Sequence, residues 1–138
     1  IRRRQRQMCI RDRDKAMTAK EVITKIYDCF AIGDMETLAS LFHDDSVTKL
    51  NGTHKMSGTF VGPQAWIENL SQIPELFNNF TITPVHMIAE GDEVFVQIHA
   101  TADGMDADFG HFIKLADGKV KEFWVYDDSQ KISDTMKS

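Results

Sequence analysis

Apolar residues recur at helical spacing near the start of the chain. From Thr18 to Gly33, positions 22, 23, 26, 27 and 30 are apolar, which is the spacing of one face of an amphipathic helix. Thr18, with Glu21 three residues later, has the form of a capping box, and Gly33 is a typical residue after a helix end. This pattern predicts the first helix.

Two shorter helical patterns follow, separated by a strand and a loop. Asp34 can begin a second helix, and Pro63 fits the first turn of a third. Between them, residues 47–50 are typical of a short strand, and residues 51–62 are polar and contain glycine, as in a loop. The first half of the chain is therefore predicted to form three helices.

The second half changes to the two-residue period of β-strands. The dipeptides at 91–92 (Gly-Asp) and 117–118 (Asp-Gly) are typical of hairpin turns. The predicted strands cover residues 80–90, 93–103, 106–116 and 119–127. Three helices followed by two long hairpins predict an α+β fold, in which the helices pack on one face of a curved antiparallel sheet.

The turn of the second hairpin also predicts which residues of its strands face each other. A two-residue turn places Asp108 opposite Asp127, on the face that carries Phe112 opposite Phe123. The other face then carries His111. A slip of one residue in register would exchange the two faces, so the assignment depends on the register.

Asp108 and Asp127 are the first candidates for chemistry. In that register their Cβ atoms lie about 5 Å apart, and two directly opposed carboxylates repel each other. In a partly dry cleft one carboxyl group would have its pKa raised and could act as a general acid or base. The alternative is that both lie at a solvated rim, where the end of the strand caps the following turn.

A loop histidine and a set of apolar residues complete the candidate site. His54 lies in the glycine-containing loop, where a catalytic role is harder to dismiss than for the other histidines. Helices packed on a curved sheet often leave a cavity at one end, which these residues could line or simply fill as core. The candidate substrate-binding residues are Ile26, Tyr27, Phe30, Trp66, Leu70, Phe112, Phe123 and Val125.

The net charge of −5 hides a strong asymmetry. All six arginines lie within the first 13 residues, whereas residues 17–138 carry nine lysines, no arginine and 19 acidic residues, a charge of −10. The string MCIRDR at 8–13 looks like translated sequencing-adapter DNA. We therefore expect residues 1–16 to be a non-native or disordered basic leader and residues 17–138 to be the domain.

Several classes of protein are disfavoured by the same composition. No apolar run approaches the roughly 20 residues of a membrane helix, and a body without arginine is poorly suited to nucleic acid. Cys29, the single cysteine of the body, favours a reducing compartment, so we expect a cytoplasmic protein. Nucleophile elbows, phosphate-binding glycine loops and metal-ligand spacings are missing, so no metal or cofactor is predicted.

Four segments in this order resemble the SnoaL-like family of the nuclear transport factor 2-like superfamily, which includes ketosteroid isomerases. They are residues 27–34 (YDCFAIGD), 41–45 (LFHDD), 54–62 (HKMSGTFVG) and 117–127 (DGKVKEFWVYD). The resemblance spans roughly residues 18–136. It implies a cone of strongly bent sheet and three helices that enclose a pocket, and often a homodimer formed through the sheet.

The resemblance does not extend to the known catalytic residues of the family. The tyrosine and two aspartates of the ketosteroid isomerases fall on Ile26, Leu50 and Gly110, which cannot do that chemistry. The catalytic aspartate of SnoaL-type cyclases falls on Trp124. Asp127 matches a carboxylate common at the end of that strand, at the pocket mouth, and His54 is similar to a loop histidine of some relatives.

Two functions of different classes follow. The first is a cofactor-free isomerase, cyclase or lyase that acts on an apolar organic molecule, with Asp127 as acid or base and Asp108 or His54 orienting it. The second is a non-catalytic module that binds a small ligand or forms dimers through the same fold, because a fold alone does not define function.

Overall fold

The computed structural model describes residues 17–137, so the predicted leader at 1–16 lies outside the described residues. Helix α2 (Ala19–Ile32) begins at Thr18, whose side chain accepts a hydrogen bond from Glu21 N at 3.2 Å. Glu21 closes the capping box from its own side, and Gly33 ends the helix with a φ of 78°. The predicted first helix is confirmed with both of its ends.

The other helices are short. Helix α3 (Met35–Ser40) and helix α4 (Pro63–Leu70) are the second and third predicted helices. Helices α5 (Ile73–Leu76) and α6 (Ser129–Thr135) were not predicted. Both are too short to show a helical period, and α6 begins at Asp128, whose side chain accepts a hydrogen bond from Lys131 N.

Six strands of the described chain form one sheet in the order β2-β1-β6-β5-β4-β3. Neighbouring strands are antiparallel except β1 and β6, which are parallel, so the sheet is mixed. The first strand is longer than predicted, and a further strand forms within the predicted loop. The strands are β1 (Phe42–Leu50), β2 (Gly58–Val61), β3 (Thr81–Glu90), β4 (Glu93–Ala102), β5 (Met105–Ala116) and β6 (Lys119–Tyr126).

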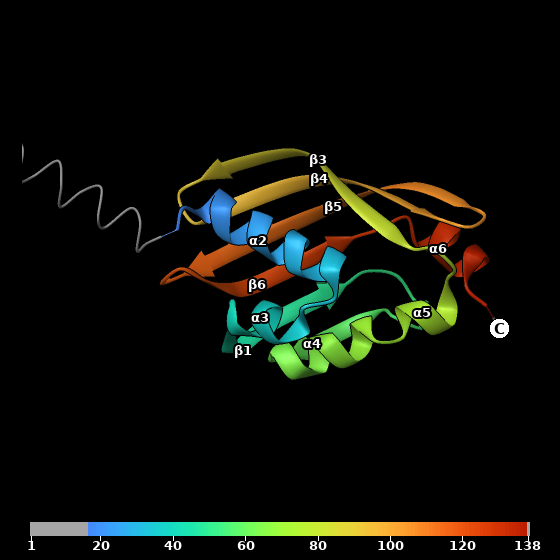
Figure 1. Ribbon diagram of the computed structural model, residues 1–138, viewed down its shortest axis with the longest axis horizontal. Helices are drawn as coiled ribbons and strands as arrows, with labels where there is room; N and C mark the ends of the chain where they lie inside the picture. Colours follow the sequence, from blue (N-terminus) through green and yellow to red (C-terminus); the bar gives the residue numbers. More distant parts are fainter. Residues whose placement is uncertain (1–16, 138) are drawn as a thin grey trace, which may run out of the picture.

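The helices gather on one side of the curved sheet (Figure 1). Helix α2 packs against β3 and β4, helix α4 packs against β1 and β2, and α6 packs against β5. The predicted α+β cone is confirmed, with its core between the helices and the inner face of the sheet. No helix within residues 17–137 is long and apolar enough to span a membrane.

The register of β5 and β6 differs from the predicted one. Leu115 pairs with Val120 next to the turn, as expected, but Lys114 then pairs with Glu122. The skipped residue, Lys121, forms a bulge that shifts all later pairs by one position. Relative to the prediction, the side chains of β5 therefore change face, whereas Phe123 and Val125 of β6 remain on the inner face.

Candidate functional site

A cavity of about 80 Å³ lies between the helices and the inner face of the sheet. Most of its wall is apolar or aromatic, contributed by α2, α4, α5, α6 and the strands. Four side chains with ionisable groups also line it: Tyr27, His54, His111 and Asp127. These four residues form two hydrogen-bonded pairs, and the chemistry of the cavity depends on them.

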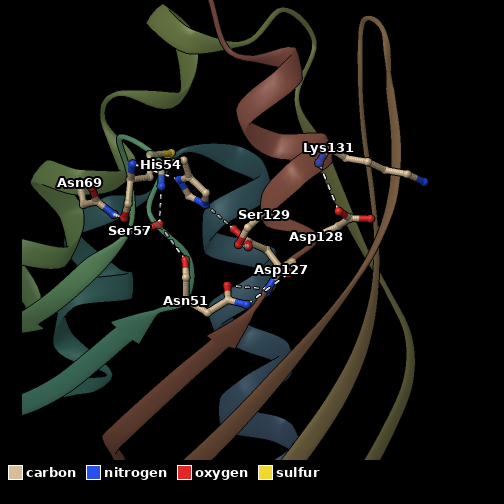
Figure 2. A network of polar contacts seen from close by, with 9 residues as sticks. Asn51, His54, Ser57, Asn69, Asp127, Asp128, Ser129 and Lys131 are labelled. Carbon is tan, nitrogen blue, oxygen red and sulfur yellow. Dashed lines mark hydrogen bonds and ion pairs between the residues drawn. The ribbon is translucent and has the colours of Figure 1, made fainter.

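The first pair joins the loop after β1 to the end of β6. His54 Nε2 lies 2.9 Å from Asp127 Oδ2, and the two side chains are only 2% and 3% exposed. Ser129 at the start of α6 donates a hydrogen bond to the other carboxylate oxygen, Oδ1, at 2.7 Å. Both oxygens of a buried carboxylate are therefore held by donors (Figure 2).

The hydrogen bonds of His54 define its tautomer. Its Nδ1 accepts the backbone N–H of Met56 at 3.2 Å, so the ring hydrogen lies on Nε2 and points to Asp127. The neutral ring is then a fixed donor to the carboxylate. In this geometry His54 orients Asp127, and the carboxylate is the group with free lone pairs.

The loop that carries His54 is hydrogen-bonded to the end of β6 and to α4. Asn51 accepts a hydrogen bond from Asp127 N at 3.0 Å, and its side-chain amide donates to Asp127 O. Ser57 donates to Asn51 O, and Asn69 of α4 donates to Met56 O. The site is thus built from the loop, from α4 and from the end of β6 (Figure 2).

Gly52 allows the loop to approach α6. Its φ of 84° favours glycine, and a Cβ atom there would lie within 2.2 Å of Ser129 Oγ. Any side chain at this position would displace the serine that donates to Asp127. This close approach explains why a glycine stands beside the site.

The second pair lies on the cavity wall between α2 and β5. The hydroxyl oxygen of Tyr27 is 2.7 Å from His111 Nδ1, and the two rings stack with centroids 5.8 Å apart. Burial lowers the pKa of His111 to about 3 and raises the pKa of Tyr27 above its usual range. Both groups are therefore neutral at pH 7.

The predicted opposition of Asp108 and Asp127 is wrong. Because of the Lys121 bulge, Gly110 pairs with Tyr126, and Asp108 faces away from the cavity on the outer side of the sheet. There it lies 3.2 Å from His99 Nδ1 on β4. Asp127 has no carboxylate neighbour of the kind predicted.

Most of the predicted lining residues do meet at the cavity. Phe112 is the exception, since it pairs with Trp124 on the outer face. The predicted residues that line the cavity are Ile26, Tyr27, Phe30, Trp66, Leu70, Phe123 and Val125, together with His54 and Asp127.

Sequence reasoning missed His111 and Ser129. A signal for His111 was present, because every second residue from Met105 to Leu115 is otherwise apolar, which predicts that this face points inward. Ser129 gave no comparable signal. Within residues 17–137, no three histidine, cysteine, aspartate or glutamate side chains are placed to hold a metal ion.

A bent mixed sheet that encloses a cavity with helices on its inner face is the architecture of nuclear transport factor 2-like proteins. Solved structures of this class match the chain over most of its length. The sequence profile of the SnoaL-like domain family matches residues 23–123, and the chain belongs to this family. No curated protein sequence matches the chain.

The similarity to solved structures extends over nearly the whole domain. Bal32a, from a soil-derived mobile gene cassette, is 20% identical with a TM-score of 0.79, over 88% of this chain and 98% of that one. TerC, co-crystallised with polyporic acid, is 24% identical with a TM-score of 0.74, over 85% and 96%. A Catenulispora acidiphila protein with a ketosteroid isomerase-like fold, in complex with trimethylamine, is 13% identical with a TM-score of 0.71, over 83% and 91%.

Proposed function

We propose that the protein is a cofactor-free enzyme that moves a proton on a small, mostly apolar carbonyl compound. Asp127 is the base that takes a proton from carbon next to the carbonyl group and returns it, in an isomerase-, cyclase- or lyase-type reaction. His54 and Ser129 are positioning residues that hold the carboxylate. One observation carries this proposal: a carboxylate 3% exposed, at the wall of an apolar cavity and paired with no lysine of residues 17–137.

The remaining lone pairs of Asp127 support this role. Each carboxylate oxygen has two acceptor sites, and His54 and Ser129 each use one. A positioned base of this kind contributes about 100- to 10,000-fold to a rate. Because two neutral donors hold the carboxylate, no cation has to be displaced before it takes a proton.

The pair of Tyr27 and His111 supports a carbonyl substrate. Each neutral group carries one hydrogen, and only one of the two hydrogens is used in the bond between them. Whichever group donates, the other hydrogen has no acceptor among residues 17–137. A substrate oxygen could accept this hydrogen, which would stabilise the negative charge that develops there when Asp127 takes a proton.

The runner-up is a binding module without catalysis. The almost wholly apolar wall of the cavity favours it, because such a wall binds small molecules without any chemistry. TerC and the Catenulispora acidiphila protein hold small organic molecules on this fold. Both functions predict ligand binding, and only the enzyme predicts proton exchange.

Proton exchange with solvent separates the two functions. The full chain is incubated in D₂O with a panel of cyclic ketones, and loss of the α-carbon proton signal is followed by ¹H NMR. We expect exchange above the buffer rate for at least one ketone. Ketones that stabilise the protein against heat but exchange only at the buffer rate would favour the binding module.

A further inference from the structure

A groove lies next to the cavity, between α2, α4 and α5. It has a volume of about 360 Å³, against about 80 Å³ for the cavity itself. Cavity and groove adjoin each other, because the side chains of Phe30, Leu70, Ile73, Phe80 and Ile82 line both. Most of the space open to a ligand therefore lies in the groove, outside the cavity.

The groove differs from the cavity in its chemistry. Among residues 17–137, no charged side chain lines it, and the hydroxyl groups at its wall are those of Ser71 and Thr81. None of the four ionisable residues of the cavity lines the groove. A ligand that occupies both spaces would meet ionisable groups only at the end that lies in the cavity.

We propose that this groove binds an unbranched apolar chain of the same ligand whose carbonyl-bearing ring occupies the cavity. The ligand class is then an amphiphile with a compact ring as its head and an alkyl chain as its tail. The position of the head rests on the proposed function, whereas the position of the tail rests on the groove alone. A charged tail does not fit, because no charged side chain among residues 17–137 lines the groove to compensate for the lost water.

The groove predicts a dependence of affinity on chain length. Each methylene that leaves water for an apolar wall strengthens binding about fourfold. The gain should stop where the chain passes Ala31 and Ser71, which are exposed at the edge of the groove. Beyond that point added methylenes remain in water and add nothing.

The test uses 2-alkylcyclohexanones with straight chains from methyl to octyl, and their dissociation constants are measured by calorimetry on the full chain. Ala31→Trp and Ser71→Trp fill the groove from its exposed edge, and neither position lines the cavity. Ile32→Trp is the matched control, because Ile32 is 78% exposed and does not line the groove.

We expect the wild type and Ile32→Trp to gain about fourfold per methylene over the first several carbons. Ala31→Trp and Ser71→Trp should bind the methyl compound like the wild type and lose most of the gain for longer chains. A wild-type affinity that does not rise with chain length would overturn the proposal, as would failure of the whole series to bind. So would an unchanged gain in both groove variants.

These results are independent of the test of catalysis. If affinity rises with chain length but no deuterium exchange occurs, the groove proposal stands and the proposed enzyme activity is wrong. If exchange occurs but affinity does not rise with chain length, the enzyme proposal stands and the groove proposal is wrong.

Discussion

Nε2 of His54 and Oδ2 of Asp127 are 2.9 Å apart, although the two residues are 73 positions apart in the sequence. The contact closes the loop after β1 onto the end of β6 and leaves both side chains almost fully buried. A carboxylate buried in this way depends on its donors, because it has lost the water that would otherwise solvate it. The stability of the protein should therefore depend on the donor at position 54.

We expect His54→Leu to lower the free energy of unfolding by roughly 1–3 kcal/mol, since it leaves Asp127 Oδ2 without its donor. His54→Gln is the matched control, because its amide can donate to Asp127 and accept from Met56 N. Urea unfolding measures the free energy of unfolding of both variants. Equal stability of His54→Leu and the wild type would contradict the account of this contact.

A double-mutant cycle measures the energy of the hydrogen bond between Tyr27 and His111. Tyr27→Phe should lower the free energy of unfolding by about 1–3 kcal/mol, because it leaves a buried imidazole nitrogen without a partner. Tyr27→Phe combined with His111→Leu should cost less than the two single changes added together. Additive costs would show that the two side chains do not interact in solution.

Burial of His111 predicts a specific dependence of stability on pH. The pKa of His111 is lowered to about 3 in the folded protein, so between that value and about 6.5 the unfolded chain binds a proton that the folded chain does not. Stability is therefore lost as the pH falls. Between pH 7 and pH 5, protonation of His111 in the unfolded chain should lower the free energy of unfolding by about 2 kcal/mol.

The variant His111→Leu isolates this contribution from that of the carboxylates. Its stability, measured by urea unfolding at both pH values, should fall by about 2 kcal/mol less than that of the wild type between pH 7 and pH 5. Identical pH dependences of the two proteins would mean that His111 is not buried in its neutral form.

The outer face of the sheet predicts self-association. Ile88, Phe95, Phe112 and Trp124 are neighbours on four successive strands and form an apolar row, in which Phe95 is 44% exposed. We expect two copies to pair through this row, and light scattering to give twice the protomer mass at micromolar concentration. Phe95→Lys should give a single protomer, and a wild type that is already monomeric would contradict the prediction.

The sequence predicted the elements whose signals are local. The capping box of Thr18 and Glu21 and the αL glycine at Gly33 bracket α2, and two dipeptide turns define the hairpins. His54 and Asp127 were predicted as site residues because His54 lies in a loop and Asp127 lies at the end of a strand. The sequence left open whether His54 or Asp108 orients Asp127, because nothing local to either segment specifies the contact.

The faces of the last hairpin could not be read from its turn alone. One extra residue, Lys121, shifts the pairing of β5 with β6 by one position and places Asp108 and Phe112 on the outer face. Val120 and Phe123 are both buried, although an odd spacing of three separates them. A regular strand cannot place both on one face, so this pair was the available sign of a bulge.

The most direct test of the central claim compares two aspartates that the sequence predicted to face each other. Asp127→Asn replaces the buried carboxylate at the cavity, and Asp108→Asn makes the same change on the outer face. The rate of deuterium exchange into the best cyclic ketone is measured for both variants at saturating ligand. We predict a rate at least 100-fold below wild type for Asp127→Asn and an unchanged rate for Asp108→Asn. Equal rates in the two variants would contradict the assignment of Asp127 as the base.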